Sequence, residues 1–151
     1  MTRILFVCLG NICRSPMAEY VMKQMVNDAG LAQAVTVASA ATSREEEGND
    51  VYPPARRTLL AHGVPCPPRT ATPLTRQDYA AWDRIIGMEA RNLADMRRIF
   101  GGDPEGKLQM LLHYAGEERG IADPWYTGDF EATYADVCAG CAGLLETLKQ
   151  K

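Results

Sequence analysis

The sequence predicts a single-domain α/β fold, in which a four-stranded parallel sheet is covered by helices on both faces. Short apolar runs alternate along the chain with segments of helical periodicity, which is the order that right-handed βαβ crossovers require. The length of 151 residues corresponds to about one ordinary domain and is sufficient for a core without disulfides or metals. A hydrophobic fraction of 46% and a charged fraction of 23% are typical of a globular protein. We therefore expect residues 1–151 to form one domain.

The charge balance and the cysteine content argue against several broad classes of protein. The net charge of −3 disfavours the broad basic surface that nucleic-acid binding requires. The first apolar stretch, Ile4 to Leu9, is too short for a signal-peptide core or a membrane span. Five cysteines are an odd number without a compact framework, which favours the reducing cytosol over secretion. We expect a cytoplasmic protein that acts on neither nucleic acid nor membrane.

The first half of the chain is expected to contain two strands and two helices. Residues 3–7 are apolar and partly β-branched, as in a buried strand, and a turn with Gly10 and Asn11 follows. Ser15 and Pro16 are expected to open a helix as its N-cap and first residue. That helix is expected to end at Gly30. A strand at 34–38 follows, and then a helix that begins after Pro53-Pro54 and ends at Gly63.

The second half repeats the pattern with weaker signals. Thr75 and Asp78 have the spacing of a capping box, which predicts a short helix through Trp82. The remaining expected elements are a strand at 84–88, a helix at 89–100 closed by Gly101-Gly102, a weaker strand at 107–112, and a helix from about 129 to 149. Ligands of such folds bind at the carboxyl ends of the strands, so the turn after the first strand is the first place to look for a site.

The turn after the first strand carries residues suited to a phosphate group. Its candidate site residues are Cys8, Leu9, Gly10, Asn11, Ile12, Cys13, Arg14 and Ser15. Successive backbone N–H groups and the following helix N-terminus can bind an anion, and Gly10 and Asn11 tolerate the backbone angles of such a nest. Arg14 offers a planar fork for two phosphate oxygens and keeps its charge at any working pH. The loop lacks the Gly-x4-Gly-Lys pattern of nucleotide-binding loops.

The same environment favours a nucleophilic sulfur. Positive potential around Cys8 is expected to hold it as a thiolate, and Ser15 could donate a hydrogen bond to that anion. A simpler interpretation takes Cys8 as a small buried hydrophobe and Arg14 as a solvated residue at a helix start. The combination of strand, Gly-Asn turn, Arg-Ser-Pro and helix favours the catalytic interpretation.

Cleavage of a phosphate ester also needs a proton for the leaving oxygen, and Asp123 is the best candidate to supply it. It stands in a loop ahead of the last helix, which a parallel sheet places at the same edge as the first loop. Pro124 stiffens that loop, and Trp125 with Tyr126 offers flat walls for an aromatic substrate. A plain Asp-Pro turn with a surface aromatic pair is the alternative.

These residues resemble those of a known family. Two segments are similar to the motifs of the low-molecular-weight protein tyrosine phosphatases. They are Val7-Cys8-Leu9-Gly10-Asn11-Ile12-Cys13-Arg14-Ser15-Pro16 and Asp123-Pro124-Trp125-Tyr126. The likeness covers the whole chain and implies the three-layer, Rossmann-like fold called phosphotyrosine phosphatase I-like. It implies a phosphotyrosine-containing protein as substrate, no metal or organic cofactor, and a monomer or weak homodimer.

The resemblance also implies roles for individual residues. Cys8 would form a phosphocysteine, Arg14 would bind the phosphate, and Asp123 would act first as acid and then as base. The other implied roles are loop support by Asn11 and Ser39, assistance to the thiolate by Ser15, and a reversible disulfide between Cys13 and Cys8.

Two segments depart from the family pattern, and both concern the wall of the substrate crevice. Relatives often carry a tryptophan in the segment that here reads Arg44-Glu45-Glu46-Glu47-Gly48, and Asp-Pro-Arg where this chain has Tyr52-Pro53-Pro54-Ala55-Arg56. We hypothesise that Tyr52 supplies the missing aromatic surface. Glu45 and its neighbours would favour basic residues beside the phosphotyrosine, unless the loop is simply a solvated acidic segment.

Three other functions are compatible with parts of the sequence. A thiol-dependent arsenate reductase needs two further cysteines in a mobile central segment, and residues 74–100 contain none. A protein arginine phosphatase tends to carry Thr where Ile12 stands and small residues where Trp125-Tyr126 stands. A phosphate-binding module without activity is disfavoured because no member of the catalytic set is missing.

Overall fold

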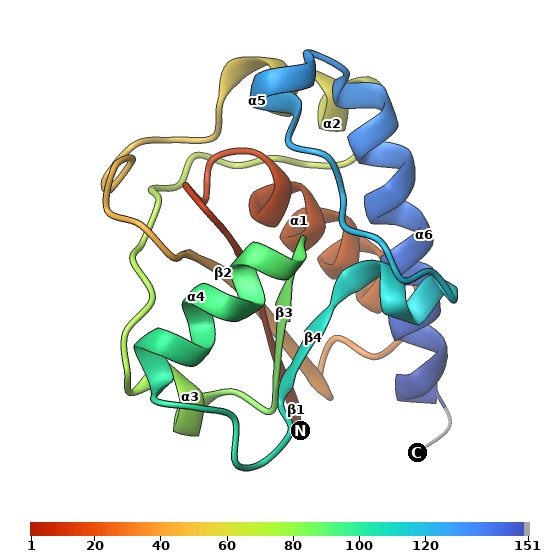
Figure 1. The fold of residues 1–151 in the computed structure, drawn as a ribbon. Helices are drawn as coiled ribbons and strands as arrows, with labels where there is room; N and C mark the ends of the chain where they lie inside the picture. Colours follow the sequence, from red (N-terminus) through yellow and green to blue (C-terminus); the bar gives the residue numbers. More distant parts are fainter. Residues whose placement is uncertain (150–151) are drawn as a thin grey trace.

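Four parallel strands form one sheet in the order β2-β1-β3-β4 (Figure 1). The structure is a computed structural model and describes residues 1–149. The strands are β1 Thr2–Cys8, β2 Val35–Ala41, β3 Arg84–Gly87 and β4 Leu108–Met110. In the two strand pairs that contain β1, Leu5 lies opposite Ala38 of β2 on one side and Ile85 of β3 on the other. The predicted parallel sheet of four strands is confirmed.

The sheet is buried on both faces, as the apolar first strand requires. Side chains alternate along β1, so that Ile4, Phe6 and Cys8 belong to one hydrophobic cluster. Leu5 and Val7 point the other way and belong to a second cluster. Helices contribute buried residues to both clusters, which gives three layers.

The helices divide between the two faces (Figure 1). They are α1 Arg14–Asp28, α2 Pro53–Ala61, α3 Asp78–Ala81, α4 Ala90–Phe100, α5 Pro124–Thr127 and α6 Phe130–Lys149. Buried residues of α1, α2 and α6 pack on the face of Phe6, whereas Met96 and Phe100 of α4 pack on the face of Leu5. Among residues 1–149, no helix has the length and apolarity that a bilayer crossing would need.

The start of the first helix differs from the prediction. Helix α1 begins at Arg14 with Cys13 at the N-cap, and no side chain caps it. Ser15 is therefore a helical residue and not the N-cap that its place before Pro16 suggested. The physical reason is that the Ser15 hydroxyl is used elsewhere, because it lies 3.0 Å from the sulfur of Cys8.

The segment predicted as a strand at 107–112 also differs. Only Leu108–Met110 pair with β3, and the chain then forms the 3-10 helix η1, Leu111–Ala115. Gly143 of α6 explains this change, since a Cβ there would stand 1.9 Å from the carbonyl oxygen of Tyr114. Close approach of α6 thus determines the backbone here, and local sequence does not encode it.

The short helix predicted after Thr75 begins later than expected. Helix α3 starts at Asp78, whose carboxylate accepts the Thr75 backbone N–H at 2.8 Å. By contrast, the helix at 89–100 matches closely, because Glu89 and Asn92 form a reciprocal capping box and Gly101 ends it in a left-handed conformation.

Candidate active site

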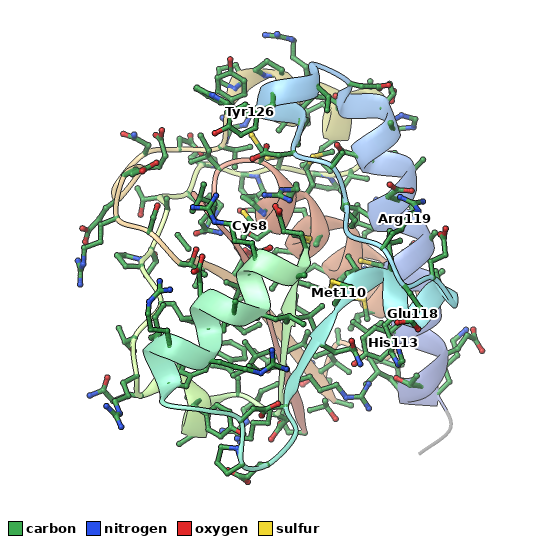
Figure 2. All side chains as sticks on the ribbon, in the orientation of Figure 1. Cys8, Met110, His113, Glu118, Arg119 and Tyr126 are labelled. Carbon is green, nitrogen blue, oxygen red and sulfur yellow. The ribbon has the colours of Figure 1, made fainter. Side chains whose placement is uncertain are left out.

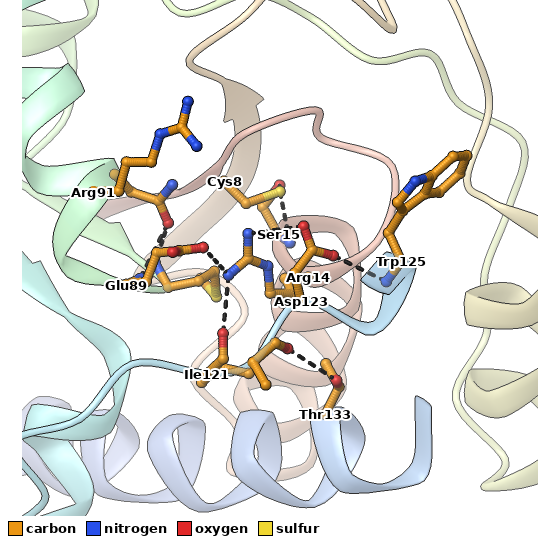
Figure 3. A network of polar contacts seen from close by, with 12 residues as sticks. Cys8, Arg14, Ser15, Glu89, Arg91, Ile121, Asp123, Trp125 and Thr133 are labelled. Atoms are coloured by element: carbon orange, nitrogen blue, oxygen red, sulfur yellow. Dashed lines mark hydrogen bonds and ion pairs between the residues drawn. The ribbon is translucent and has the colours of Figure 1, made fainter. Parts of the chain in front are cut away.

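The loop after β1 winds closely around the sulfur of Cys8. The backbone N–H groups of Asn11 and Ser15 both point to this sulfur, at 3.3 and 3.4 Å. The Ser15 hydroxyl is a third polar neighbour at 3.0 Å (Figure 3). Such a set of donors favours a negative charge on the sulfur. Asn11 makes the winding possible with a positive φ of 59°, which Asn tolerates better than most residues.

The side chain of Asn11 is completely buried and joins the loop to its surroundings. Its amide nitrogen donates to the hydroxyls of Ser15 at 2.7 Å and Ser39 at 2.9 Å. Ser39, on β2, in turn donates to the buried carboxylate of Glu19 on α1. The two serines and Asn11 are thus mutually satisfied, as buried polar groups must be.

Arg14 is the largest buried polar side chain of the site, with 2% of its surface exposed. Its guanidinium donates to the Glu89 carboxylate and, at 2.9 Å, to the carbonyl oxygen of Ile121 (Figure 3). Burial alone would lower the pKa of Arg14, but the Cys8 thiolate and two neighbouring carboxylates outweigh it, and the pKa is raised. The guanidinium therefore stays charged at the base of the site.

Asp123 reaches the same edge from the other end of the chain. Its Oδ2 lies 3.4 Å from Arg14 Nη2, and its Oδ1 accepts the backbone N–H of Trp125 at 3.0 Å. The second contact makes Asp123 the N-cap of α5, a helical turn that the sequence did not indicate. The preceding carbonyl, of Ala122, accepts the Thr133 hydroxyl at 3.3 Å, so that α6 holds the segment.

The segment before Asp123 passes unusually close to the start of α4. A Cβ at Gly120 would lie 2.8 Å from the Cβ of Glu89 and 3.0 Å from its Cα. The backbone N–H of Ile121 donates to the carbonyl of Met88 at 2.8 Å at the same point. Because Gly120 has no side chain, the segment that leads to Asp123 can pass close to Glu89, the carboxylate partner of Arg14.

A cavity of about 140 Å³ opens above these residues. Its lining consists of Cys8, Leu9, Gly10, Ile12, Cys13, Arg14, Glu45, Glu46, Asp123, Trp125 and Tyr126. Trp125 and Tyr126 are 51% and 79% exposed, and Tyr126 stands at the outer edge of the molecule, away from the interior Cys8 (Figure 2). Tyr52 lies behind Trp125, with ring centroids 4.7 Å apart, and does not line the cavity.

The second cysteine of the loop has a different character from the first. Cys13 is buried, and burial together with the negative charge of Cys8 raises the pKa of its thiol well above the ordinary value. Cys13 is therefore a neutral thiol at neutral pH. All five cysteines are free, and among residues 1–149 no three His, Cys, Asp or Glu side chains converge as metal ligands would.

The structure brings together the predicted set and adds three residues to it. Cys8, Arg14 and Asp123 meet at one edge, and Ser39 contacts Asn11. The additions, which sequence reasoning did not count as site residues, are Glu19, Arg69 and Glu89. A signal existed for Glu89, which stands two residues after the last residue of the third strand, at the carboxyl edge. For the other two the sequence carries no comparable signal.

The site combines a sulfur with three polar neighbours, a buried guanidinium and a carboxyl group around one small cavity. These are the groups that phosphoryl transfer through a covalent intermediate requires. Comparison with known proteins agrees with this chemistry. Residues 3–151 match the family model described as low molecular weight phosphotyrosine protein phosphatase.

Individual relatives cover nearly the full chain. The low molecular weight protein-tyrosine-phosphatase YfkJ of Bacillus subtilis is 32% identical over 100% of this chain and 98% of its own. The human low molecular weight phosphotyrosine protein phosphatase is 36% identical over 95% of this chain and 93% of its own. The crystal structure of YfkJ superposes with a TM-score of 0.96 over 99% of this chain and 96% of its own. A Drosophila arginine phosphatase superposes at 0.87 with 30% identity, over 99% of this chain and 98% of its own.

Proposed function

The chain belongs to the low molecular weight protein tyrosine phosphatase family, and from this premise we propose how its own residues hydrolyse phosphotyrosine. The observation that carries the proposal is the convergence of Cys8, Arg14 and Asp123 on one cavity. Cys8 is the nucleophile, because three polar hydrogens can reach its sulfur. Arg14 binds the phosphate, and Glu89 and the Ile121 carbonyl hold its guanidinium in place.

In the first step the Cys8 thiolate attacks phosphorus. The S–P bond forms, the bond from phosphorus to the tyrosyl oxygen breaks, and Asp123 gives its proton to that oxygen. Because Oδ1 of Asp123 accepts the Trp125 N–H, we assign the transferred proton to Oδ2, which lies 3.4 Å from Arg14 Nη2. Backbone N–H groups of Leu9 to Ser15 and the guanidinium of Arg14 stabilise the phosphoryl oxygens.

In the second step water hydrolyses the phosphocysteine. Asp123, now a carboxylate, takes a proton from the water, whose oxygen attacks phosphorus while the S–P bond breaks. The Ser15 hydroxyl assists the leaving thiolate, from which it is 3.0 Å away. Inorganic phosphate and the free thiolate are the products of this step, and no metal or organic cofactor takes part.

The walls of the cavity provide the substrate preference in this proposal. Trp125 and Tyr126 offer flat apolar surface to the tyrosyl ring, and Tyr52 supports Trp125 from behind. Glu45 lines the same opening and favours a basic residue beside the phosphotyrosine. Asn11 and Ser39 keep the loop in its bound shape.

Cys13 completes the proposal as a redox partner. When a peroxide oxidises Cys8 to a sulfenic acid, the neighbouring Cys13 thiol condenses with it, releases water and forms a reversible disulfide. A thiolate enzyme of this kind needs a reducing compartment, and we therefore propose a cytoplasmic protein that acts as a monomer or weak homodimer on phosphotyrosine proteins. Nucleic acid and membrane are not among its proposed partners.

The decisive experiment is phosphate release from matched peptides that carry phosphotyrosine, phosphoserine or phosphoarginine, without added metal. We expect turnover of phosphotyrosine that disappears in Cys8→Ser. Turnover confined to phosphoarginine would favour the arginine phosphatases, one of which shares the fold. The bulky Ile12 and the two aromatic residues in the cavity favour a tyrosyl ring instead.

A folded, reduced protein without turnover on any peptide would contradict the proposal. Arsenate with thioredoxin as reductant would then test the arsenate reductase alternative. Binding of a phosphotyrosine peptide without turnover would identify a binding module.

A further inference from the structure

Arg69 points inward, toward the phosphate loop, from the irregular segment between α2 and α3. Its guanidinium donates two hydrogen bonds to one residue, to the Asn11 carbonyl oxygen at 3.0 Å and to the Asn11 side-chain Oδ1 at 2.7 Å. Asp50 anchors the segment, because it accepts the Arg69 backbone N–H at 3.2 Å and the Arg56 guanidinium at 2.8 Å. Arg69 is thus a fixed, partly buried cation that contacts neither Cys8 nor the cavity.

These contacts fix which way the amide of Asn11 faces. An arginine and a backbone N–H can only donate, and Arg69 and the Thr72 N–H both meet the same oxygen, at 2.7 and 3.2 Å. The amide oxygen of Asn11 is therefore on that side. Its NH₂ group must face the hydroxyls of Ser15 and Ser39.

The direction of the two hydroxyl protons follows from this orientation. The Glu19 carboxylate only accepts, so Ser39 donates to Glu19 and accepts from Asn11. Ser15 accepts from Asn11 in the same way, which leaves its proton for the sulfur of Cys8. If the amide were reversed, its oxygen would face both hydroxyls and would compete with the sulfur for the Ser15 proton.

We propose that Arg69 is a positioning residue for the reaction at Cys8: it fixes the amide of Asn11 and thereby directs the Ser15 hydroxyl proton to the thiolate. This inference rests on the proposed role of Cys8 as nucleophile. Arg69 acts through Asn11 and Ser15 and touches no reacting atom. The effect of removing it is therefore a smaller thiolate fraction, not a loss of phosphate contacts.

The test is the pH dependence of Cys8 alkylation by iodoacetamide, with the modified residue identified by fragment-ion mass spectrometry. In Arg69→Met we expect the midpoint of the pH profile of Cys8 alkylation to move to higher pH. Below that midpoint the alkylation rate should fall about tenfold, which corresponds to the loss of one hydrogen bond to a charged group. Arg69→Lys keeps a charged donor without the planar fork that reaches both Asn11 oxygens, and it should recover part of the rate. Arg56→Met is the matched control, because Arg56 holds the same segment through the Cys66 carbonyl without touching Asn11.

The pathway is tested in a Ser15→Ala background. Arg69→Met should add no further change there, since the hydroxyl through which it acts is missing. Three outcomes would each overturn the proposal. The alkylation profile of Arg69→Met could be unshifted, or its shift could equal that of Arg56→Met. The third is a full tenfold loss of rate when Arg69→Met is added to Ser15→Ala. Alkylation needs no turnover, so wild-type protein that releases no phosphate would contradict the proposed function without deciding the role of Arg69.

Discussion

The base and the rim of the cavity both carry polar side chains but hold them differently. At the base, which we define as residues 8–15 with Asp123, the side chains of Asn11, Arg14 and Ser15 are at most 2% exposed and each makes several polar contacts. At the rim, defined as residues 44–47 with 125–126, Tyr126 is 79% exposed and Arg44 pairs with Glu47 of its own loop.

This difference separates the chemistry from the choice of substrate. A buried donor or acceptor left without its partner costs about 1–3 kcal/mol, so a change at the base disturbs several neighbours at once. An exposed side chain can be replaced at a cost within about 0.5 kcal/mol. We therefore expect substitutions at the base to alter turnover, and substitutions at the rim to alter preference among substrates.

The largest effect is expected for Asp123→Asn. Asparagine can still cap α5 but cannot give a proton, so turnover of phosphotyrosine peptides should fall about 10²- to 10⁴-fold. The loss should be much smaller for an aryl phosphate whose leaving oxygen needs no proton. Asp129→Asn, a neighbouring cap that accepts the Ala132 N–H, is the control. Equal losses on both substrates would contradict the role of Asp123 as the acid.

Gly120→Ala tests whether the base depends on close backbone approach. The new Cβ would meet Glu89 at 2.8 Å, so the segment must move and carry the Ile121 carbonyl away from Arg14. We expect a loss of about 1–3 kcal/mol in unfolding free energy, measured with urea. Gly10→Ala is the comparison for stability, because its Cβ would meet the flexible Glu46 side chain at 3.3 Å. Equal losses in the two variants would contradict a dependence of the base on the close backbone approach at Gly120.

The acidic rim should affect selectivity by a few-fold. In Glu45→Gln and Glu46→Gln we expect the preference for Arg or Lys beside phosphotyrosine to fall about two- to fivefold, as for an exposed ion pair, and less at high salt. Competition between peptide pairs measures the ratio directly. Glu47→Gln is the matched control, since Glu47 already pairs with Arg44. An unchanged ratio would leave the loop as a solvated acidic segment.

The smallest effect is expected at Asp50, an exposed carboxylate outside both regions. A hydrogen bond from Arg56 lowers the pKa of Asp50 to about 2. Because this folded-state pKa lies below the unfolded value of about 3.9, the stabilisation is present above about pH 4 and is lost as the pH falls toward 2. Asp50→Asn should cost under about 1 kcal/mol at pH 7. Urea unfolding at several pH values measures the difference in unfolding free energy between the wild-type protein and Asp50→Asn. This difference should shrink in acid, and a difference that stays constant with pH would contradict the lowered pKa of Asp50.

The sequence predicted the strands, the longer helices and the three catalytic candidates because each depends on local signals. Apolar runs, caps and a parallel βα order are visible in a single chain, and the carboxyl-edge rule brings Cys8 and Asp123 together. Where the prediction missed, a distant contact overrode the local signal. Ser15 has the sequence of an N-cap but gives its hydroxyl to the Cys8 sulfur, and 111–115 is helical because α6 approaches closely at Gly143.

By itself, then, the sequence determined the sheet, its order along the chain and the chemistry of the first loop. Tertiary structure alone decided two supports of that loop: Glu19 and Arg69 come from separate segments and reach Ser39 and Asn11 only in the folded molecule. The physical reason is that local propensity depends on residues a few positions apart. A buried hydrogen bond depends on whichever donor the packing brings within about 3 Å, however far away it lies in the chain.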